Sequence, residues 1–315
     1  MNLGRCLGCY QDLAEGIYHP KCSKSLFGAA TPPELATTIE EMEQLAFRFL
    51  KERLTLPGVQ RKLSLGIAGK DPKRLTLLGG LGGNFTLKPS SPEYEQLPEN
   101  EDLVMHLAKV CGLKIAPHGL IPMGDGSLAY VTKRFDRKGK AKIAVEDLCQ
   151  LSELLTEQKY RSSHEQVGKM IRRYSSVPGD DVLRFFELLV FSFVVGNSDM
   201  HLKNFSFITE NADKVRLSPA YDLLSVRLVI SAKEDPEELA LSLNGKKSKL
   251  SRKDFEVCAA SLKISPKVCS MVLQKQIGAM PAMKALVDRS FLHQKNRGHL
   301  KAIITENIAK LKVMS

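Results

Sequence analysis

The sequence predicts an α+β fold of two lobes, and two observations carry this prediction. Strand-like patterns gather before about residue 138, whereas helical patterns dominate after it. With 315 residues, of which 43% are hydrophobic, the chain has enough apolar side chains for two cores. We therefore expect a Cys/His-containing segment at 1–30, a mixed, strand-rich N-lobe at 31–138 and a mainly helical C-lobe at 139–315.

The expected N-lobe combines hydrophobic alternation with one glycine-rich turn. Its predicted elements are a helix over 37–53, strands over 61–67 and 84–90 separated by a turn at 79–83, a helix over 100–111, and two strands within 118–136. In the C-lobe, a strongly apolar helix is expected over 183–195. The polar cluster at 196–204 ends this helix, a short strand follows at 205–209, and the rest is mainly helical.

Composition and charge limit the functional classes. No segment approaches the roughly 20 apolar residues of a membrane span, and the first residues lack a signal-peptide pattern, so we expect a cytoplasmic protein. The net charge is +11, and residues 241–315 hold 15 Lys or Arg against 4 Asp or Glu. Either these are solvated helix faces or they meet an acidic partner such as nucleic acid. The few aromatic residues among them argue against a single-strand stacking groove.

The densest polar cluster, GNSDMHLKN (196–204), directly follows the predicted buried helix. Asp199 and Asn204 have the Asp-x-x-x-x-Asn spacing of a protein-kinase catalytic loop, with Lys203 between them. In such a loop the Asp orients the substrate hydroxyl and the Asn holds a metal ion on the ATP phosphates. A basic residue between them offsets charge in the transition state. The spacing alone also occurs by chance.

A second acidic position lies eighteen residues after Asn204, beyond a predicted strand and turn. Asp222, in LSPAYDLL (217–224), stands where a kinase carries its metal-binding aspartate. The alternative is an aspartate that caps the following helix. The position of Asp222 after the first cluster favours the metal-binding interpretation.

Candidate phosphate-binding residues lie in the expected N-lobe. The turn that begins at Gly58 runs into a predicted strand, so its backbone N–H groups could cover phosphates, although an ordinary loop explains it as well. Lys88, on another predicted strand, suits a lysine that reaches the α- and β-phosphates. Glu101 opens the next helix and could pair with Lys88, or it could simply complement the helix dipole.

Seven motifs, in order, resemble the HipA-like toxin kinases. They are GVQRKLSL (58–65), FTLKPS (85–90), PENE with HLAKVCGL (98–113), KRFDR (133–137), VEDLCQLS (145–152), GNSDMHLKNFS (196–206) and LSPAYDLLS (217–225), with NGKK (244–247) as a weak extension. GNSDxHxKN together with PAYDLL is specific. Within the family the chain looks closest to the short HipT-like members, which the opening CLGCYQDL…YHPKC also fits.

The resemblance implies a protein-kinase-like fold and phosphorylation of Ser or Thr with ATP and Mg²⁺. It implies the toxin of a toxin–antitoxin pair whose targets include aminoacyl-tRNA synthetases. The implied partners are a HipB-like DNA-binding antitoxin and, in the short members, a separate HipS-like small protein. DNA would then be met only indirectly, through the antitoxin, and no membrane is involved.

The resemblance also assigns roles to residues. Asp199 would be the catalytic aspartate, with His201 and Lys203 in the same loop, and Asn204 and Asp222 would hold Mg²⁺. The ATP-binding set would be Gly58, Val59, Gln60 and Lys62 in the Gly-rich loop, Lys88 with Glu101, and Arg134 with Phe135 at the hinge against adenine. Family members often autophosphorylate a Ser just ahead of this loop. Here Thr55 is the only hydroxyl in 54–57, and it is the autophosphorylation candidate.

The N-terminal segment carries Cys6-x-x-Cys9 followed by His19-x-x-Cys22. Two pairs of soft ligands at this spacing are close to a zinc-ribbon or zinc-knuckle arrangement, and in a reducing compartment a metal is favoured over a disulfide. A metal-free packed or reactive segment is the alternative. The remaining cysteines (Cys111, Cys149, Cys258 and Cys269) lie singly in apolar surroundings typical of buried thiols.

Two other classes of function remain open at this level. A nucleic-acid-binding regulator would use the basic C-terminal region and the Cys/His cluster, with a vestigial kinase loop. Against it, Asp199, Asn204 and Asp222 are all competent for phosphoryl transfer. A small-molecule kinase is the other alternative, because a kinase loop does not define the acceptor.

Overall fold

A computed structural model describes residues 4–38, 40–41, 62–68, 73–77, 83–139, 141–210 and 214–312. Two compact units divide the chain. The N-terminal unit comprises Met1–Asp102, Ala116–Gly139 and Arg289–Phe291, and the C-terminal unit comprises Leu103–Ile115, Lys140–Asp288 and Leu292–Ser315. The predicted single boundary near residue 138 misses two short segments. Residues 103–115 belong to the C-terminal unit, and residues 289–291 belong to the N-terminal unit. The predicted helix over 37–53 and turn at 79–83 lie almost wholly outside the described residues.

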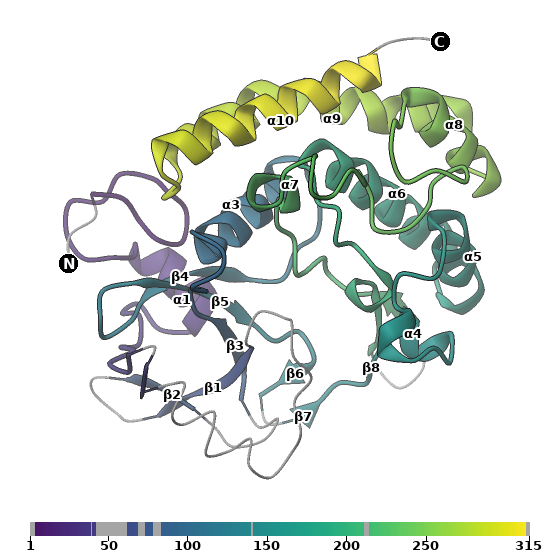
Figure 1. Ribbon diagram of the computed structural model, residues 1–315. Coiled ribbons are helices and arrows are strands. Elements are labelled where there is room, and N and C mark those ends of the chain that lie inside the picture. The colour runs from purple at the N-terminus through teal and green to yellow at the C-terminus, as the bar shows by residue number, and fades with distance from the viewer. Residues whose placement is uncertain are drawn as a thin grey trace. The chain divides into compact units, whose positions relative to one another are not determined.

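The N-terminal unit is built on a five-stranded antiparallel sheet in the order β2-β1-β3-β5-β4 (Figure 1). The elements are α1 (Pro20–Phe27), β1 (Leu63–Ala68), β2 (Arg74–Leu77), β3 (Phe85–Lys88), β4 (His118–Pro122), β5 (Leu128–Lys133), β6 (Arg137–Lys138) and the first residues of α3 (Leu97–Val110). Strand β3 lies between β1 and β5, with Lys88 opposite Tyr130. The strand β2 was not predicted, although its sequence RLTL alternates polar and apolar residues.

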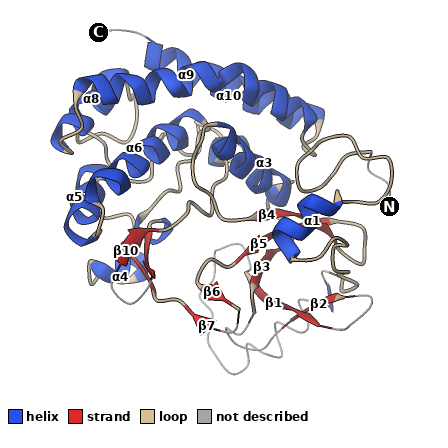
Figure 2. Cartoon of the chain, turned by 180° about the vertical axis from the view of Figure 1, so that it is seen from behind, coloured by secondary structure: helices blue, strands red, loops and turns tan. Residues whose placement is uncertain are grey.

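The C-terminal unit is mainly helical, as Figure 2 shows. Its helices are the rest of α3, α4 (Leu148–Leu151), η1 (Thr156–Gln158), α5 (His164–Tyr174), α6 (Pro178–Val194), η2 (Leu202–Asn204), α7 (Val226–Val229), α8 (Arg252–Ser261), α9 (Pro266–Arg289) and α10 (Gln294–Lys312). Its strands are β7 (Ala141–Lys142), β8 (Val145–Asp147), β9 (Ser206–Glu210) and β10 (Lys214–Leu217), and the last three form a small sheet in the order β10-β9-β8.

Helix α6 is the centre of the C-terminal unit. Pro178 fits its first turn because no N–H is needed there, and Asp180 and Asp181 complement the positive end of the helix dipole. Its later residues are almost continuously buried, including Phe186 and Phe193. Helix α10 packs beside it, and the Asn307 amide donates a 2.8 Å hydrogen bond to the Phe193 carbonyl oxygen. The loop that follows α6 therefore starts from a fixed point.

Many charges of the basic C-terminal region have acidic neighbours. Lys275 lies 2.8 Å from Glu187 on α6, and Lys310 lies 2.9 Å from Glu238. Such ion pairs on half-exposed helix faces contribute little to stability, but they account for part of the charge without a partner molecule. Among the residues that the structure describes, no helix is both long and apolar enough to cross a membrane.

Candidate active site

The loop at 196–204 begins where α6 ends. Gly196 has a φ of +68°, in the left-handed region that favours glycine. A Cβ at this position would lie only 2.8 Å from the Arg227 Cβ and 3.0 Å from an Ile303 methyl carbon. Glycine is thus required both for the turn and for the close approach of α7 and α10. The Asn197 side-chain oxygen then accepts the Asp199 N–H at 3.2 Å, which fixes the start of the loop.

Asp199 projects from this anchored loop with a side chain that is 42% exposed. One carboxylate oxygen accepts a 2.6 Å hydrogen bond from the Tyr160 hydroxyl, and the His201 ring nitrogen Nε2 lies 3.8 Å from the same oxygen. Burial, together with this bond to Asp199, raises the pKa of Tyr160, so Tyr160 acts as a donor at neutral pH. Burial lowers the pKa of His201, and the neighbouring Asp199 only partly opposes this effect.

The second half of the loop folds back on the first. The Asn204 amide nitrogen donates a 2.9 Å hydrogen bond to the Asp199 carbonyl oxygen, which directs the amide NH₂ inward and leaves the amide oxygen as an acceptor. Lys203 lies 3.0 Å from Asp147, at the end of β8. Asp147 also caps α4 by accepting the Gln150 N–H. The loop is therefore closed on itself and tied to β8.

Asp222 reaches the loop through the β9–β10 hairpin. In that hairpin Phe207 lies opposite Leu217, so the chain returns from β10 alongside the end of the loop. The Tyr221 hydroxyl donates to the Lys203 carbonyl oxygen at 2.8 Å and lies 2.6 Å from the Ser206 hydroxyl. Asp222 itself has a φ of +59°. A non-glycine residue in this region is uncommon and is found preferentially at functional sites.

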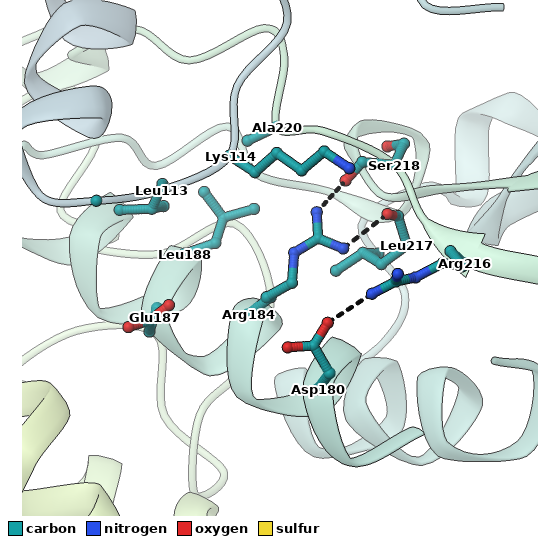
Figure 3. A pocket seen from close by; sticks show the side chains of 11 residues that line it. Leu113, Lys114, Asp180, Arg184, Glu187, Leu188, Arg216, Leu217, Ser218 and Ala220 are labelled. Carbon is teal, nitrogen blue, oxygen red and sulfur yellow. Dashed lines mark hydrogen bonds and ion pairs between the residues drawn. The ribbon is translucent and has the colours of Figure 1, made fainter. Parts of the chain in front are cut away.

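Arg184 of α6 holds the segment that leads to Asp222. Its guanidinium donates to the carbonyl oxygens of Leu217 and Ser218 at 3.0 and 3.1 Å (Figure 3). It also pairs with Asp181 at 2.8 Å. Arg184, Leu217 and Ser218 line a cavity of about 230 Å³ that Lys114 also borders. Because the guanidinium holds two backbone carbonyl oxygens while Asp181 fixes its orientation, Arg184 positions the chain that leads to Asp222.

Lys88 and Glu101 form an ion pair within the N-terminal unit. The Lys88 ammonium nitrogen lies 2.6 and 2.7 Å from the two Glu101 carboxylate oxygens, and both side chains are at most 4% exposed. Lys88 also lies over the Tyr130 ring at 5.7 Å. The expected pair is therefore present. A charge buried in this way is strongly held, since an unpaired ammonium group would be costly at this depth.

The remaining predicted ATP-binding positions are only partly described. The Arg134 guanidinium pairs with Asp136 at 2.6 Å. The backbone N–H of Arg134 donates to the Asn84 carbonyl oxygen, which connects the end of β5 to the start of β3. Phe135 follows in a half-buried turn, and Lys62 is exposed just before β1. Thr55, Gly58, Val59 and Gln60 lie outside the described residues, so their roles stay predictions.

Tyr160 and Asp147 are the residues of this region that the sequence did not single out. Asp147 lies inside the matched motif VEDLCQLS, but the motif does not indicate that its carboxylate lies near Lys203. Tyr160 follows η1 and belongs to none of the matched motifs. Its contact with Asp199 spans 39 positions, which no local pattern could indicate.

The four N-terminal residues predicted as zinc ligands also come together. The Cys6, Cys9 and Cys22 sulfurs and one ring nitrogen of His19 lie within 4.8 Å of one another, all in the N-terminal unit. All seven cysteines of the chain are free thiols in this structure. This cluster shares no residue with the loop at 196–204.

Residues 54–284 match the protein family described as HipA-like C-terminal domain. The chain is 34% identical over 254 residues to "Putative kinase Y4dM" of Sinorhizobium fredii, an alignment that covers 76% of the chain and 60% of that protein. It is 27% identical over 217 residues to the serine/threonine-protein kinase toxin HipA of Shewanella oneidensis, covering 62% of the chain and 47% of that toxin. The chain therefore spans about half to three fifths of the length of these relatives.

The fold has a counterpart among solved structures. A Shewanella oneidensis structure, described as a complex of HipA, HipB and operator DNA, superposes on 90% of this chain and 74% of its own with a TM-score of 0.68. The sequence identity of 20% limits this likeness to the fold. It agrees with the predicted two-lobed, kinase-like α+β architecture.

Proposed function

The chain belongs to the HipA-like C-terminal domain family, and from this premise we propose that it is an ATP- and Mg²⁺-dependent Ser/Thr protein kinase. The observation that carries the proposal is the closed loop in which Asn204 bonds back to Asp199, with Tyr221 fixing the neighbouring Asp222 against the same loop. These residues lie on anchored backbone within one unit, and they are of the types that phosphoryl transfer uses, which supports the proposal.

The donor set suits Mg²⁺, which prefers hard oxygen ligands. Asn204 offers its amide oxygen, because its amide nitrogen is engaged by the Asp199 carbonyl, and Asp222 offers a carboxylate. These two residues would hold the ion. When bound, the ion would neutralise phosphate charge during transfer.

The remaining residues would act directly on the reactants. Asp199 would orient the Ser or Thr hydroxyl and accept its proton as the hydroxyl oxygen bonds to the γ-phosphorus of ATP and the bond to the bridging oxygen breaks, releasing ADP. Lys203 would offset the negative charge near the reacting groups, while Asp147 limits its rotation. Lys88, held by Glu101, would contact the α- and β-phosphates.

In the cell, we propose that the protein is a cytoplasmic toxin of a toxin–antitoxin system, similar to the short HipT-like members. Its partners would be a HipB-like DNA-binding antitoxin and a HipS-like small protein, and DNA would be reached only through the antitoxin. The HipA, HipB and operator DNA complex supports this type of assembly. The acceptor would be a translation component such as an aminoacyl-tRNA synthetase.

The decisive experiment incubates purified protein and a bacterial lysate with γ-labelled ATP and Mg²⁺. The proposal expects a few labelled protein bands that contain phosphoserine or phosphothreonine and disappear with Asp199→Ala or with EDTA. Asp180→Ala is the matched control, because Asp180 is an aspartate of similar exposure in the same unit. Label confined to small molecules would assign a small-molecule kinase, and no label would favour the nucleic-acid-binding regulator.

Two further measurements address the cellular role. Phosphoproteomics after brief induction, with Asp199→Ala as reference, would identify the target, and growth inhibition by Asp199→Ala equal to that of the unaltered protein would contradict kinase-based toxicity. Phosphopeptide mass spectrometry after incubation with Mg-ATP tests autophosphorylation of Thr55. Absence of phosphate on Thr55 in active protein would exclude this modification.

A further inference from the structure

The Cys/His cluster of the N-terminal segment has the dimensions of a metal site. Its four candidate ligand atoms lie within 4.8 Å of one another, and the Cys9 sulfur is 3.4 Å from the His19 nitrogen Nδ1. Around a tetrahedral zinc ion with ordinary bond lengths, neighbouring sulfur and nitrogen ligands lie about 3.5–3.8 Å apart. The cluster therefore needs only small side-chain adjustments to accept such an ion.

The imidazole of His19 is oriented for coordination. Its Nε2 lies 3.1 Å from the Asp12 carbonyl oxygen, so this nitrogen carries the proton and donates the hydrogen bond. The other nitrogen, Nδ1, then presents its lone pair to the cluster. Metal-binding histidines typically use a carbonyl or carboxylate partner in this way to fix their tautomer and ring orientation.

Backbone N–H groups hold the sulfur of Cys6 in a fixed position. The N–H groups of Gly8 and His19 both point at the Cys6 sulfur, at 3.4 and 3.2 Å. Backbone N–H groups that contact a ligand atom in this way hold it in place for coordination, as outer-shell partners do in metal sites. Cys6 is also fully buried, so its sulfur faces the cluster and not the solvent.

The chain fold brings the two ligand pairs together at close range. The N–H groups of Cys9 and Tyr10 bond to the Cys6 carbonyl oxygen, forming a tight turn. A Cβ on Gly8 would lie 2.6 Å from the Tyr18 ring and 3.2 Å from the Cys22 Cβ, so only glycine allows this packing. His19 is the N-cap of α1 and Cys22 lies in its first turn, which directs both toward the turn at Cys6.

We propose that Cys6, Cys9, His19 and Cys22 bind one Zn²⁺ ion as a structural site. Four protein ligands close the coordination shell and leave no position for substrate, so the site serves folding and not catalysis. The segment at 1–30 is short, and a segment of this size commonly uses a metal or a disulfide to supplement its core. The proposal is independent of the kinase activity.

The site would fix two tyrosines that connect the segment to the rest of the N-terminal unit. The Tyr10 hydroxyl donates to Asp102 at 2.6 Å, and the Tyr18 hydroxyl donates to the Leu120 carbonyl oxygen on β4 at 2.7 Å. Tyr10 has a φ of +63°, a backbone conformation that the turn at Cys6 must maintain. Asp102 directly follows Glu101, the partner of Lys88.

The test is the metal content of the full-length protein, purified under reducing conditions without chelators and measured by elemental analysis. We expect about one zinc per chain, lost in Cys9→Ser and Cys22→Ser. It should be retained in Cys149→Ser, which alters a buried thiol of the C-terminal unit, and in Asp199→Ala. Full zinc content in Cys9→Ser and Cys22→Ser would overturn the assignment.

Titration of the unaltered protein with Co²⁺ keeps the proposal testable if the cysteine variants do not fold. A tetrahedral site with three thiolates gives intense sulfur-to-cobalt charge-transfer absorption, which Zn²⁺ should abolish by displacement. Zinc below about one tenth of an ion per chain, with no such absorption on adding Co²⁺, would refute the site. A disulfide between two of these cysteines in freshly purified protein would refute it as well.

Discussion

Two aspartates of the C-terminal unit, Asp181 and Asp199, stand in opposite environments. Asp181 is fully buried, and its oxygens accept bonds from the Ser175 hydroxyl, the Leu217 N–H and the Arg184 guanidinium. Asp199 is 42% exposed, and among the described side chains only Tyr160 is at hydrogen-bonding distance from its carboxylate. A buried carboxylate surrounded by hydrogen-bond donors maintains the fold. A half-exposed carboxylate on a rigid loop can instead contact a substrate.

The largest expected effect comes from Asp199. Asp199→Ala should lower the rate of phosphate transfer by about 10²–10⁴-fold, the usual contribution of a positioned acid or base. The melting temperature should stay within a few degrees, because few protein contacts are lost. Single-turnover transfer of labelled phosphate measures the rate, and calorimetry measures the melting temperature. A rate within tenfold of the unaltered protein would remove Asp199 from the catalytic role.

Asp181→Ala should show the opposite pattern. It removes the buried carboxylate that pairs with the Arg184 guanidinium and accepts the Leu217 N–H, so the free energy of unfolding should fall by about 3–5 kcal/mol. Urea denaturation followed by circular dichroism measures this change. In the same assay Asp180→Ala should lower stability by no more than about 1 kcal/mol, because its contacts with Arg216 and the helix dipole are exposed to solvent. If both substitutions lowered the free energy of unfolding by the same amount, burial would not account for the role of Asp181.

His164 extends the comparison to pH. Burial among Phe185 and Phe205 lowers the pKa of His164 to about 3, well below the 6.5 of an unfolded histidine. The unfolded chain therefore binds the extra proton between pH 6.5 and 3, so the contribution of this residue to stability falls as pH falls through that window. At pH 5 the loss is about 2 kcal/mol relative to pH 8.

The matched variant for this effect is His164→Phe, which has no titratable group. Urea midpoints at pH 8 and pH 5 should differ less in this variant than in the unaltered protein, by the equivalent of about 2 kcal/mol. An identical pH dependence in both proteins would show that other groups control acid stability.

The smallest expected effect concerns Tyr160. Tyr160→Phe removes one hydrogen bond to a half-exposed carboxylate, worth about 1 kcal/mol, so kcat should fall about fivefold with KM for ATP unchanged. Steady-state kinetics over a range of ATP concentrations separates the two parameters. A loss as large as that of Asp199→Ala would make Tyr160 part of the chemistry instead of a positioning residue.

The sequence predicted local features of the site better than its long-range supports. The loop at 196–204, the hairpin strand β9 and the Lys88–Glu101 pair all follow from short patterns or fixed spacings. The Arg184 clamp and the Tyr160 contact do not, because each joins residues more than 30 positions apart. The alternation in strand β2 covers only RLTL and was overlooked, and the return of 103–115 to the C-terminal unit depends on tertiary packing.

The two hydrogen-bonding contacts of the Tyr221 hydroxyl have a consequence for inhibitors. A compound that requires the Asp222 segment to swing outward would have to break the bonds to the Lys203 carbonyl and to Ser206 together. A compound that leaves Asp222 in place would meet no such cost. Chemical series directed at this protein should therefore favour ligands that accept the observed backbone of 217–222 over those that demand its rearrangement.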